Sequence, residues 1–524
     1  MKKLKYITLS LLAIGFISCE NDTLEDLRSR GQQEPVELEV FTQGSADFST
    51  YVSLGNSLTA GFADGALYKI SQENSTPAIL AQQFAALGNG GSFTQPLMND
   101  NVGGLLAGGN QLPGFGARLA LDLSGPSPRP VPLPLLNPAA VSTTDIVLNN
   151  PTGPFNNLGV PGAKSFHLLA PGYGDLNGIF ASPATANPYF VRMASSASTS
   201  VVADAIAQQP SFISLWIGNN DVLGYALSGG DGTNPITPID GPAGVGFEAT
   251  YQTIIGSLTA NIDGLQGILA NIPNVTAIPH FTTVPHNPVP LDQATADAVN
   301  GAYAAYNGGI VQAFAFLVGQ GALTQEEADA EIARRTISFS AGAGNAVVIL
   351  DEDLTDLTAI NPALTNMRQA TAEDLLVLPA SSFIGTEAVE GDPRTINGVA
   401  IPLADRWVLT PEEQSDIETA TIAYNGVIEA AATANGFALL DANALLDQLA
   451  ATGIATNNLV LTSNLVTGGA FSLDGVHPTS RGYALIANEM LKAIDATYGS
   501  NFEASGNLVD VSAYNTTYSA GLIE

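Results

Sequence analysis

The stretch "YVSLGNSLTAGFADG", residues 51–65, is the best guide to how this chain folds. A hydrophobic run ends at Gly55, and a turn of small and polar residues follows at once. Runs of β-branched and aromatic residues closed by glycine are typical of buried strands, so we expect a strand over residues 48–56. Ser57 comes directly afterwards, and is either a nucleophile at a strand end or one polar residue in a loop.

Similar short apolar segments alternate with amphipathic ones along the rest of the chain. We predict strands within 211–221, 275–281, 345–351 and 436–441, and helices over 247–272, 304–317, 422–436 and 479–499. Alternation of this kind is typical of α/β proteins whose parallel sheet is covered by helices on both faces. Sites in such sheets lie at the carboxyl ends of the strands, and Ser57 and Asn220 both follow predicted strands.

The composition sets limits on size and function. The chain has 524 residues, 45% of them hydrophobic, which is enough for one large domain or for one domain with long insertions. Its 53 glycines and 31 prolines predict long irregular connections, above all over residues 84–158. With 17 basic and 49 acidic side chains the net charge is -32, which excludes nucleic acid as an expected partner because phosphates would be repelled.

The N-terminus has the pattern of an export signal. Lys2, Lys3 and Lys5 precede a short apolar run that ends at Ser18 and Cys19, and this run is too short to span a membrane. Cys19 is the only cysteine in the chain, and its setting resembles the lipobox of bacterial lipoproteins, in which the cysteine is lipidated. The alternative is an ordinary cleaved signal with an incidental cysteine. In either case the core is held by packing without disulfides.

Residues 19–45 are polar and acidic, and they lack the periodicity of a helix or strand. We interpret them as a flexible tether that follows a signal peptide over residues 1–18. Acidic residues directly after the cysteine also resemble the surface-export signals of Bacteroidetes lipoproteins. The sequence therefore predicts an exported lipoprotein anchored by lipid in the outer membrane, on its periplasmic or its outer face.

A base for Ser57 is offered near the C-terminus by His477, in "DGVHP" (474–478). An aspartate three residues before a histidine can curl back and accept a hydrogen bond from the imidazole Nδ1–H, which leaves Nε2 free to face a serine. Such a pair suits a serine nucleophile, because the hydroxyl needs a base and the base needs an orienting group. A surface loop without a role is the alternative for Asp474 and His477.

Two further segments offer donors for an oxyanion hole, the group that stabilises the negative charge of a tetrahedral intermediate. "NLGVPGA" (157–163) is a turn in which Gly162 can present its main-chain N–H, and "GNND" (218–221) brings the side-chain amide of Asn220 after a strand. Each of these segments alone is an ordinary turn signal.

Taken in this order, "GNSL", "NLGVPGA", "GNND" and "DGVHP" resemble the blocks of the GDSL, or SGNH, hydrolase family. The resemblance implies a flavodoxin-like three-layer α/β/α fold and hydrolysis of ester bonds without a cofactor. It implies that Ser57 is the nucleophile, that His477 is the base and that Asp474 orients His477. It also implies that the N–H of Ser57 joins Gly162 and Asn220 in the oxyanion hole.

The chain departs from the family in two respects. Asn56 stands where the family's name motif has aspartate, a change that leaves the nucleophile intact but alters the local turn. The chain is also long, so we predict a hydrolase domain over residues 46–500 with insertions at about 66–155 and 287–410. A C-terminal extension covers residues 501–524. The first insertion is apolar enough to cover an acyl pocket, although core packing explains its leucines equally well.

The remaining polar motifs carry no expected cofactor or metal. His167 is interpreted as a packed or capping residue, and His280 and His286 as possible lining of a pocket, since their spacing matches no standard zinc motif. "DEDLTD" (351–356) lacks the glycine and distal glutamate of a calcium loop and is interpreted as a solvated turn. "GGDGTNP" (229–235) is a turn by composition.

The sequence thus predicts a membrane-tethered serine esterase, lipase or acylhydrolase that acts on an acyl lipid or an acetylated glycan. The alternative is a surface lipoprotein of the same fold that binds glycan or lipid and has lost catalysis, because large insertions rich in glycine and proline suit binding surfaces. Neither the ester substrate nor the oligomeric state follows from the sequence.

Overall fold

The protein is described by a computed structural model that covers residues 38–88, 90–125, 127–232, 234–456 and 458–524. The predicted signal peptide, the lipidation site at Cys19 and most of the acidic tether lie outside these residues. Within the ranges that are described, no helix has both the length and the apolar character needed to cross a membrane.

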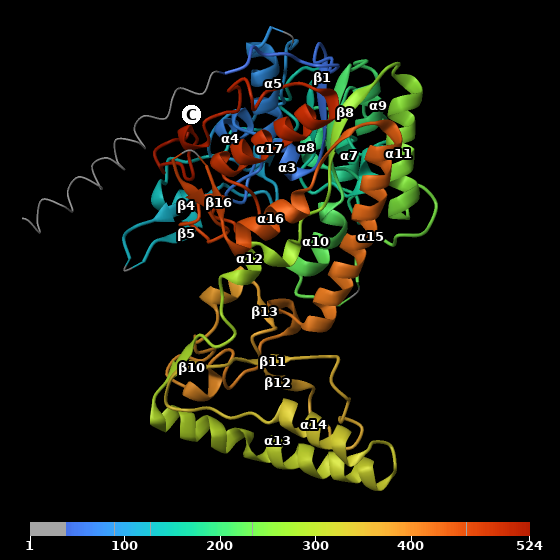
Figure 1. Cartoon of the computed structure of the whole chain (residues 1–524). Helices are drawn as coiled ribbons and strands as arrows, with labels where there is room; N and C mark the ends of the chain where they lie inside the picture. The colour runs from blue at the N-terminus through green and yellow to red at the C-terminus, as the bar shows by residue number, and fades with distance from the viewer. Residues whose placement is uncertain (1–37, 89, 126, 233, 457) are drawn as a thin grey trace, which may run out of the picture.

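A five-stranded parallel sheet forms the centre of the molecule (Figure 1). Its strands lie in the order β15 (Ala438–Leu440), β8 (Gln266–Ala270), β7 (Phe212–Trp216), β1 (Tyr51–Gly55) and β6 (Asn157–Gly159). When these five strands are numbered along the chain and read from β6 to β15, their order is 2-1-3-4-5, which is the flavodoxin-like order. The connection after β1 leads to β6 on one side of it, and the next connection returns to β7 on the other side. The loops that follow β6, β1 and β7 therefore lie together at the carboxyl ends of these parallel strands.

Two groups of helices cover the sheet and make three layers, as predicted. One group contains α5 (Thr76–Ala86) and α17 (Ser480–Tyr498), which pack together, and α17 also lies against β15. The other contains α9 (Val201–Ile206), α11 (Phe247–Asn261) and α15 (Pro411–Asn435), with α11 between the other two. The α/β fold class predicted from the sequence is therefore confirmed.

The predicted C-terminal helix has the expected start. Thr479 caps α17 by accepting a hydrogen bond from Gly482 N, and Gly499 ends the helix in the left-handed conformation at φ 70°. Its apolar residues face the sheet, and they include Tyr483, Leu491 and Ile494, all of which are fully buried. An N-cap, a periodic apolar face and a C-terminal glycine together define this helix.

The predictions for residues 247–281 were wrong in detail. The helix ends at Asn261, and the strand beside β7 is β8, which begins after a turn at Gly264 with φ 67°. Gly267 is needed in β8, because a Cβ there would lie 2.7 Å from Ile213 Cγ1. The segment 275–281, predicted as a strand, forms η2 (Val275–Ala277) and the start of α12 (Pro279–Thr282). Proline at the first position of α12 and the Asn274 cap of η2 favour these short helices.

Between α12 and α15 the chain builds a lobe with its own hydrophobic core (Figure 1, lower part). The lobe contains the long helix α13 (Gln293–Gly319) and α14 (Gln325–Arg335). Residues 345–351, predicted as a strand of the parallel sheet, instead provide β11 (Val348–Leu350), which pairs with β12 (Met367–Gln369) in antiparallel fashion. A continuous apolar run such as residues 346–350 predicts a buried strand but does not reveal which sheet it joins.

The segment 66–155 is mostly irregular and packs on itself. Leu105 and Leu112 belong to a small apolar cluster with Met98, Ile146 and Tyr189, so core packing accounts for these leucines. The buried guanidinium of Arg118 fastens the C-terminal residues to this segment by donating hydrogen bonds to the carbonyl oxygens of Ser519 (2.9 Å) and Leu522 (3.2 Å).

The remaining elements are short, apart from α10 and α16. The helices are α3 (Ser57–Ala60), α4 (Lys69–Glu73), α6 (Leu133–Leu136), η1 (Ser165–Leu169), α7 (Leu176–Ile179), α8 (Pro188–Val191), α10 (Asn219–Leu227), η3 (Leu378–Ser382), η4 (Pro393–Thr395), η5 (Asp405–Trp407), α16 (Ala442–Ala451) and η6 (Val511–Ala513). The strands are β2 (Leu106–Ala107), β3 (Asn110–Gln111), β4 (Leu119–Asp122), β5 (Arg129–Pro132), β9 (Val289–Leu291), β10 (Gly342–Asn345), β13 (Leu375–Leu376), β14 (Val408–Leu409), β16 (Ile454–Ala455) and β17 (Val460–Leu461).

Candidate active site

Ser57 lies at the first position of α3, directly beyond the carboxyl end of β1. A sharp passage from strand to helix is possible here because Gly55 has no side chain, and a Cβ on it would lie 2.4 Å from the carbonyl oxygen of Trp216 on β7. Ser57 is 8% exposed, so its neighbours hold it in place while part of it remains accessible from the surface. The interpretation of Ser57 as an ordinary loop residue does not describe this position.

Asn56, the departure from the family motif, caps the helix that carries Ser57. Its Oδ1 accepts a hydrogen bond from Leu58 N at 2.9 Å, and its Nδ2 donates to Asn219 Oδ1 at 2.9 Å. One amide thus satisfies the first turn of α3 and links it to the first turn of α10. Aspartate could provide the cap but could not donate the second bond.

His477 and Asp474 lie beside Ser57 although they are more than 400 residues away in the chain. His477 Nε2 is 2.9 Å from Ser57 Oγ, and His477 Nδ1 is 2.9 Å from Asp474 Oδ2. Both distances are normal for hydrogen bonds. With the proton on Nδ1 donated to the carboxylate, Nε2 is the acceptor that faces the serine hydroxyl, which is the tautomer a base requires.

The Asp474 carboxylate accepts four further hydrogen bonds, three from its own loop and one from the α3–α4 connection. Its Oδ1 accepts hydrogen bonds from Val476 N, His477 N and Ser472 Oγ, and its Oδ2 accepts one from Gly65 N at 2.9 Å. Burial raises the pKa of Asp474, but the charge of His477 and these hydrogen bonds outweigh burial and hold the pKa well below its usual range. The carboxylate is therefore ionised over the whole pH range in which a histidine titrates.

Gly162 and Asn220 come from the strands on either side of β1. Gly162 follows β6 in a turn at φ 81°, where the chain favours glycine, and Asn220 is the second residue of α10, which follows β7. Asn220 Nδ2 donates to the carbonyl oxygen of Ala163 at 2.8 Å, which joins the two segments and leaves the second amide hydrogen for another acceptor.

These segments can supply three N–H donors to one oxygen atom. Among the described residues, no acceptor lies in hydrogen-bonding geometry to the main-chain N–H of Ser57 or of Gly162. Together with Asn220 they form a set of donors at the carboxyl ends of three adjacent parallel strands. Negative charge that develops on a carbonyl oxygen beside Ser57 would be stabilised by such donors.

Asp64 and Phe62 also belong to this site, although no sequence motif marks either residue as functional. Asp64 accepts hydrogen bonds from Leu473 N (3.0 Å) and Tyr68 Oη (2.7 Å). The first of these bonds links the residue before "DGVHP" (474–478) to the end of the 51–65 segment. Burial raises the pKa of Asp64 to about 6. The Phe62 ring lies 4.6 Å from the His477 ring and restricts its orientation.

His167 and His280 have partners other than the serine. His167 caps η1 by accepting from Lys164 N, and it stacks on Tyr173 at 4.5 Å. Burial and the charge of Lys164 lower the pKa of His167 to about 4. His280 is buried behind the Asp474 loop, and its main-chain N–H donates to Gly475 O. Burial lowers the pKa of His280 to about 4, although the Asp474 charge opposes the shift.

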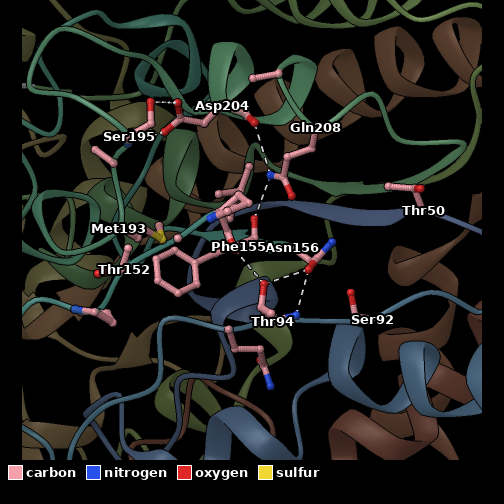
Figure 2. A pocket seen from close by; sticks show the side chains of 17 residues that line it. Thr50, Ser92, Thr94, Thr152, Phe155, Asn156, Met193, Ser195, Asp204 and Gln208 are labelled. Atoms are coloured by element: carbon pink, nitrogen blue, oxygen red, sulfur yellow. Dashed lines mark hydrogen bonds between the residues drawn. The ribbon is translucent and has the colours of Figure 1, made fainter.

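A large cavity lies at the amino ends of β1 and β6 (Figure 2), whereas Ser57 follows the carboxyl end of β1. It has a volume of about 1080 Å³, and Thr50 and Asn156, which line it, precede β1 and β6 at their amino ends. Its polar side chains bond to one another, as when Thr94 Oγ1 donates to Asn156 Oδ1 and Ser195 Oγ donates to Asp204 Oδ1. The cavity is therefore separate from the Ser57 site.

A second cavity, of about 90 Å³, adjoins the neighbours of the serine and the histidine. Leu58 and Val476 line it together with apolar residues of α16 and α17, such as Leu446 and Leu485. All of its lining residues are apolar or glycine.

Comparison with known proteins adds little to this geometry. No family model matches the chain, and no curated protein matches it. Among solved structures, an extracellular lipase from Streptomyces rimosus matches 86% of this chain and 99% of its own, with 11% sequence identity and a TM-score of 0.29. A TM-score this low supports no conclusion about fold or activity.

Proposed function

We propose that the chain is a serine ester hydrolase of the GDSL type, with Ser57 as nucleophile. The observation that carries this proposal is the unbroken set of hydrogen bonds from Ser57 Oγ through His477 to the Asp474 carboxylate, each 2.9 Å long. A nucleophile, a base and an orienting acid in contact are what acyl transfer to serine requires.

The reaction begins when Ser57 Oγ attacks the carbonyl carbon of the ester and His477 Nε2 takes the hydroxyl proton. The carbonyl oxygen becomes an oxyanion and accepts hydrogen bonds from Ser57 N, Gly162 N and Asn220 Nδ2. His477 then gives its proton to the leaving alkoxide, which departs and leaves an acyl-enzyme. Water, deprotonated by His477, attacks the acyl carbon by the same route and frees the serine.

Asp474 holds His477 in the tautomer that this reaction needs and stabilises the imidazolium that forms after each proton transfer. Its lowered pKa keeps it negatively charged throughout, so it receives no proton itself. His477 is 14% and Asp474 12% exposed at the side chain, which limits the water that would weaken this pair.

The substrate is proposed to be a carboxylic ester of an acyl lipid or an acetylated glycan. The small apolar cavity beside Leu58 and Val476 favours an acyl group with a short hydrocarbon portion. The N-terminal pattern supports an exported lipoprotein tethered to the outer membrane through Cys19, which would hold the site near a membrane surface.

The test is hydrolysis of p-nitrophenyl esters of increasing acyl length, and of acetylated xylan, by the wild type and by Ser57→Ala. We expect turnover by the wild type and its loss in Ser57→Ala with an unchanged circular dichroism spectrum. Ser195→Ala is the matched control, because that serine lies at the separate cavity. A folded wild type that binds an acetylated glycan but hydrolyses no ester would favour the non-catalytic binding lipoprotein instead.

A further inference from the structure

Three carboxylates meet where the 284–408 lobe joins the α/β core. Glu352 follows β11 in the lobe, Asp405 begins η5, and Glu413 lies in the first turn of α15. Each offers an oxygen atom, and these oxygens all lie within 4.8 Å of one another. Like charges at this spacing repel strongly unless a cation or protons lie between them.

Glu413 distinguishes this cluster from acidic side chains on an ordinary protein surface, because Glu413 is buried. The residue is 3% exposed, and its Oε2 accepts hydrogen bonds from Thr410 N (2.6 Å) and Thr410 Oγ1 (3.0 Å). Its Oε1 is buried and has no hydrogen-bond partner among the described residues, and the same holds for Asp405 Oδ1. Buried carboxylate oxygens without a donor are costly, and proteins satisfy them with a cation or a metal ion.

The turn after α10 closes over Glu413. A Cβ on Gly230, at φ 78°, would lie 1.7 Å from Glu413 Oε1, and a Cβ on Gly229, at φ 66°, would lie 2.6 Å from the carbonyl oxygen of Asp405. Only glycine allows the chain to approach this closely. The turn at Gly229 and Gly230 therefore packs directly against Asp405 and Glu413.

Two basic side chains beside these segments in sequence or by ion pairing, Arg406 and Arg334, have other partners. Arg334 forms ion pairs with Asp351 (3.2 Å) and Glu412 (3.3 Å), and the Arg406 guanidinium lies over the Trp407 ring at 5.1 Å. Burial, together with the neighbouring acids, raises the pKa of Asp405 and that of Glu413 above the usual carboxyl range.

We propose that Glu352, Asp405 and Glu413 bind one Ca²⁺ ion, which fastens the 284–408 lobe to the α/β core. The ligand atoms are all oxygen, which selects hard cations over zinc. Calcium accepts several carboxylates in an irregular shell of 6–8 oxygens, whereas magnesium requires a near-ideal octahedron and keeps its waters. The expectation that "DEDLTD" is only a solvated turn changes accordingly, since it supplies Glu352. This proposal does not depend on ester hydrolysis.

The test is calorimetric titration of the full chain with Ca²⁺ and separately with Mg²⁺, after removal of metals with EDTA. We expect one Ca²⁺ per chain with a dissociation constant between about 10⁻⁵ and 10⁻³ M and weaker Mg²⁺ binding. The unfolding midpoint should rise with the logarithm of the Ca²⁺ concentration above the dissociation constant.

Glu413→Gln keeps the size and shape of the side chain, but glutamine cannot ionise and so cannot supply the negative charge that binds a cation. We expect this variant to lose at least about ten-fold in Ca²⁺ affinity, as for other changes around metal sites, and to lose the rise in midpoint. Glu418→Gln, an exposed site on the same helix, is the matched control and should keep both. Asp405→Asn replaces Glu413→Gln if the latter does not fold.

Two results would overturn the proposal. One is an absence of stoichiometric Ca²⁺ binding by the wild type up to roughly 10 mM, ten times the weakest value expected for such a site. The other is equal Ca²⁺ affinity in Glu413→Gln and the wild type. Either result means that the three acids hold no Ca²⁺ ion.

Discussion

Replacing Asp474 by asparagine keeps the shape of the side chain and removes its charge, and the structure shows what the amide would meet. Both carboxylate oxygens of Asp474 accept hydrogen bonds from main-chain N–H groups. An NH₂ at the Oδ1 position would face the N–H groups of Val476 and His477, and an NH₂ at the Oδ2 position would face only that of Gly65. We therefore expect the amide nitrogen to take the Oδ2 position, where it costs fewest bonds.

In that position the amide donates to His477 Nδ1, so the ring carries its proton on Nε2. Nε2–H then faces Ser57 Oγ and cannot accept the serine proton, which removes the base. In a serine protease, replacing the triad aspartate by asparagine leaves the histidine in the wrong tautomer and lowers kcat by about 10⁴-fold. We expect kcat to fall by about 10³- to 10⁴-fold here. That loss corresponds to about 4–5.5 kcal/mol of transition-state stabilisation at 1.36 kcal/mol per decade.

The assay is the steady-state hydrolysis of the best p-nitrophenyl ester by Asp474→Asn at pH 7.5, with kcat and KM measured separately. The loss should fall on kcat, because Asp474 does not touch the substrate. Asp510→Asn, which changes an exposed helix-capping aspartate, is the control and should keep full activity. A kcat within ten-fold of the wild type in a folded Asp474→Asn protein would refute the orienting role of this carboxylate.

Three further substitutions test the surroundings of the serine. Asn56→Asp should keep the cap on α3 and most of the activity, because Asn219 Nδ2, which has no partner among the described residues, can turn to donate to the new carboxylate; a loss above about ten-fold in kcat/KM would contradict this. Asn220→Ala removes one oxyanion donor and should lower kcat by about 10²- to 10³-fold with little change in KM, so an unchanged kcat would exclude it from the oxyanion hole. Asp64 has a pKa raised to about 6, so its contribution to stability is present at low pH and is lost as the pH rises from about 4 to about 6. Urea unfolding at pH 4.5 and pH 7 should therefore show the stability of Asp64→Asn rising by about 2 kcal/mol relative to the wild type between the two pH values, and a constant difference would contradict the raised pKa.

The parts of the fold that could be predicted are those fixed by local signals. Residues 51–55 and 212–216 are strands because their apolar runs end in glycine-bearing turns, and α17 begins at Ser480 because Thr479 caps it. The polar residues that follow these strands meet at one edge, since parallel strands end on the same side of the sheet. Asp474 and His477 follow no predicted strand, so their proximity to Ser57 was an expectation from the resemblance to the SGNH blocks and not from topology.

The parts that could not be predicted depend on contacts between distant segments. β8 was hidden within an apolar run that also fits a helix, and its place is decided by packing of Gly267 against Ile213 on β7. β6 has only three residues, which is too short for any periodicity. Glu352, Asp405 and Glu413 are brought together by the junction of two cores, and no local motif links them.

The most direct test of the central claim is labelling with a fluorophosphonate, which phosphonylates a serine only when its hydroxyl is activated. The account predicts one stoichiometric adduct per chain, mapped by mass spectrometry to Ser57. Labelling should be abolished in Ser57→Ala and slowed at least about 10³-fold in His477→Ala. An adduct on another serine, or equal labelling rates in His477→Ala and the wild type, would contradict the claim that His477 activates Ser57.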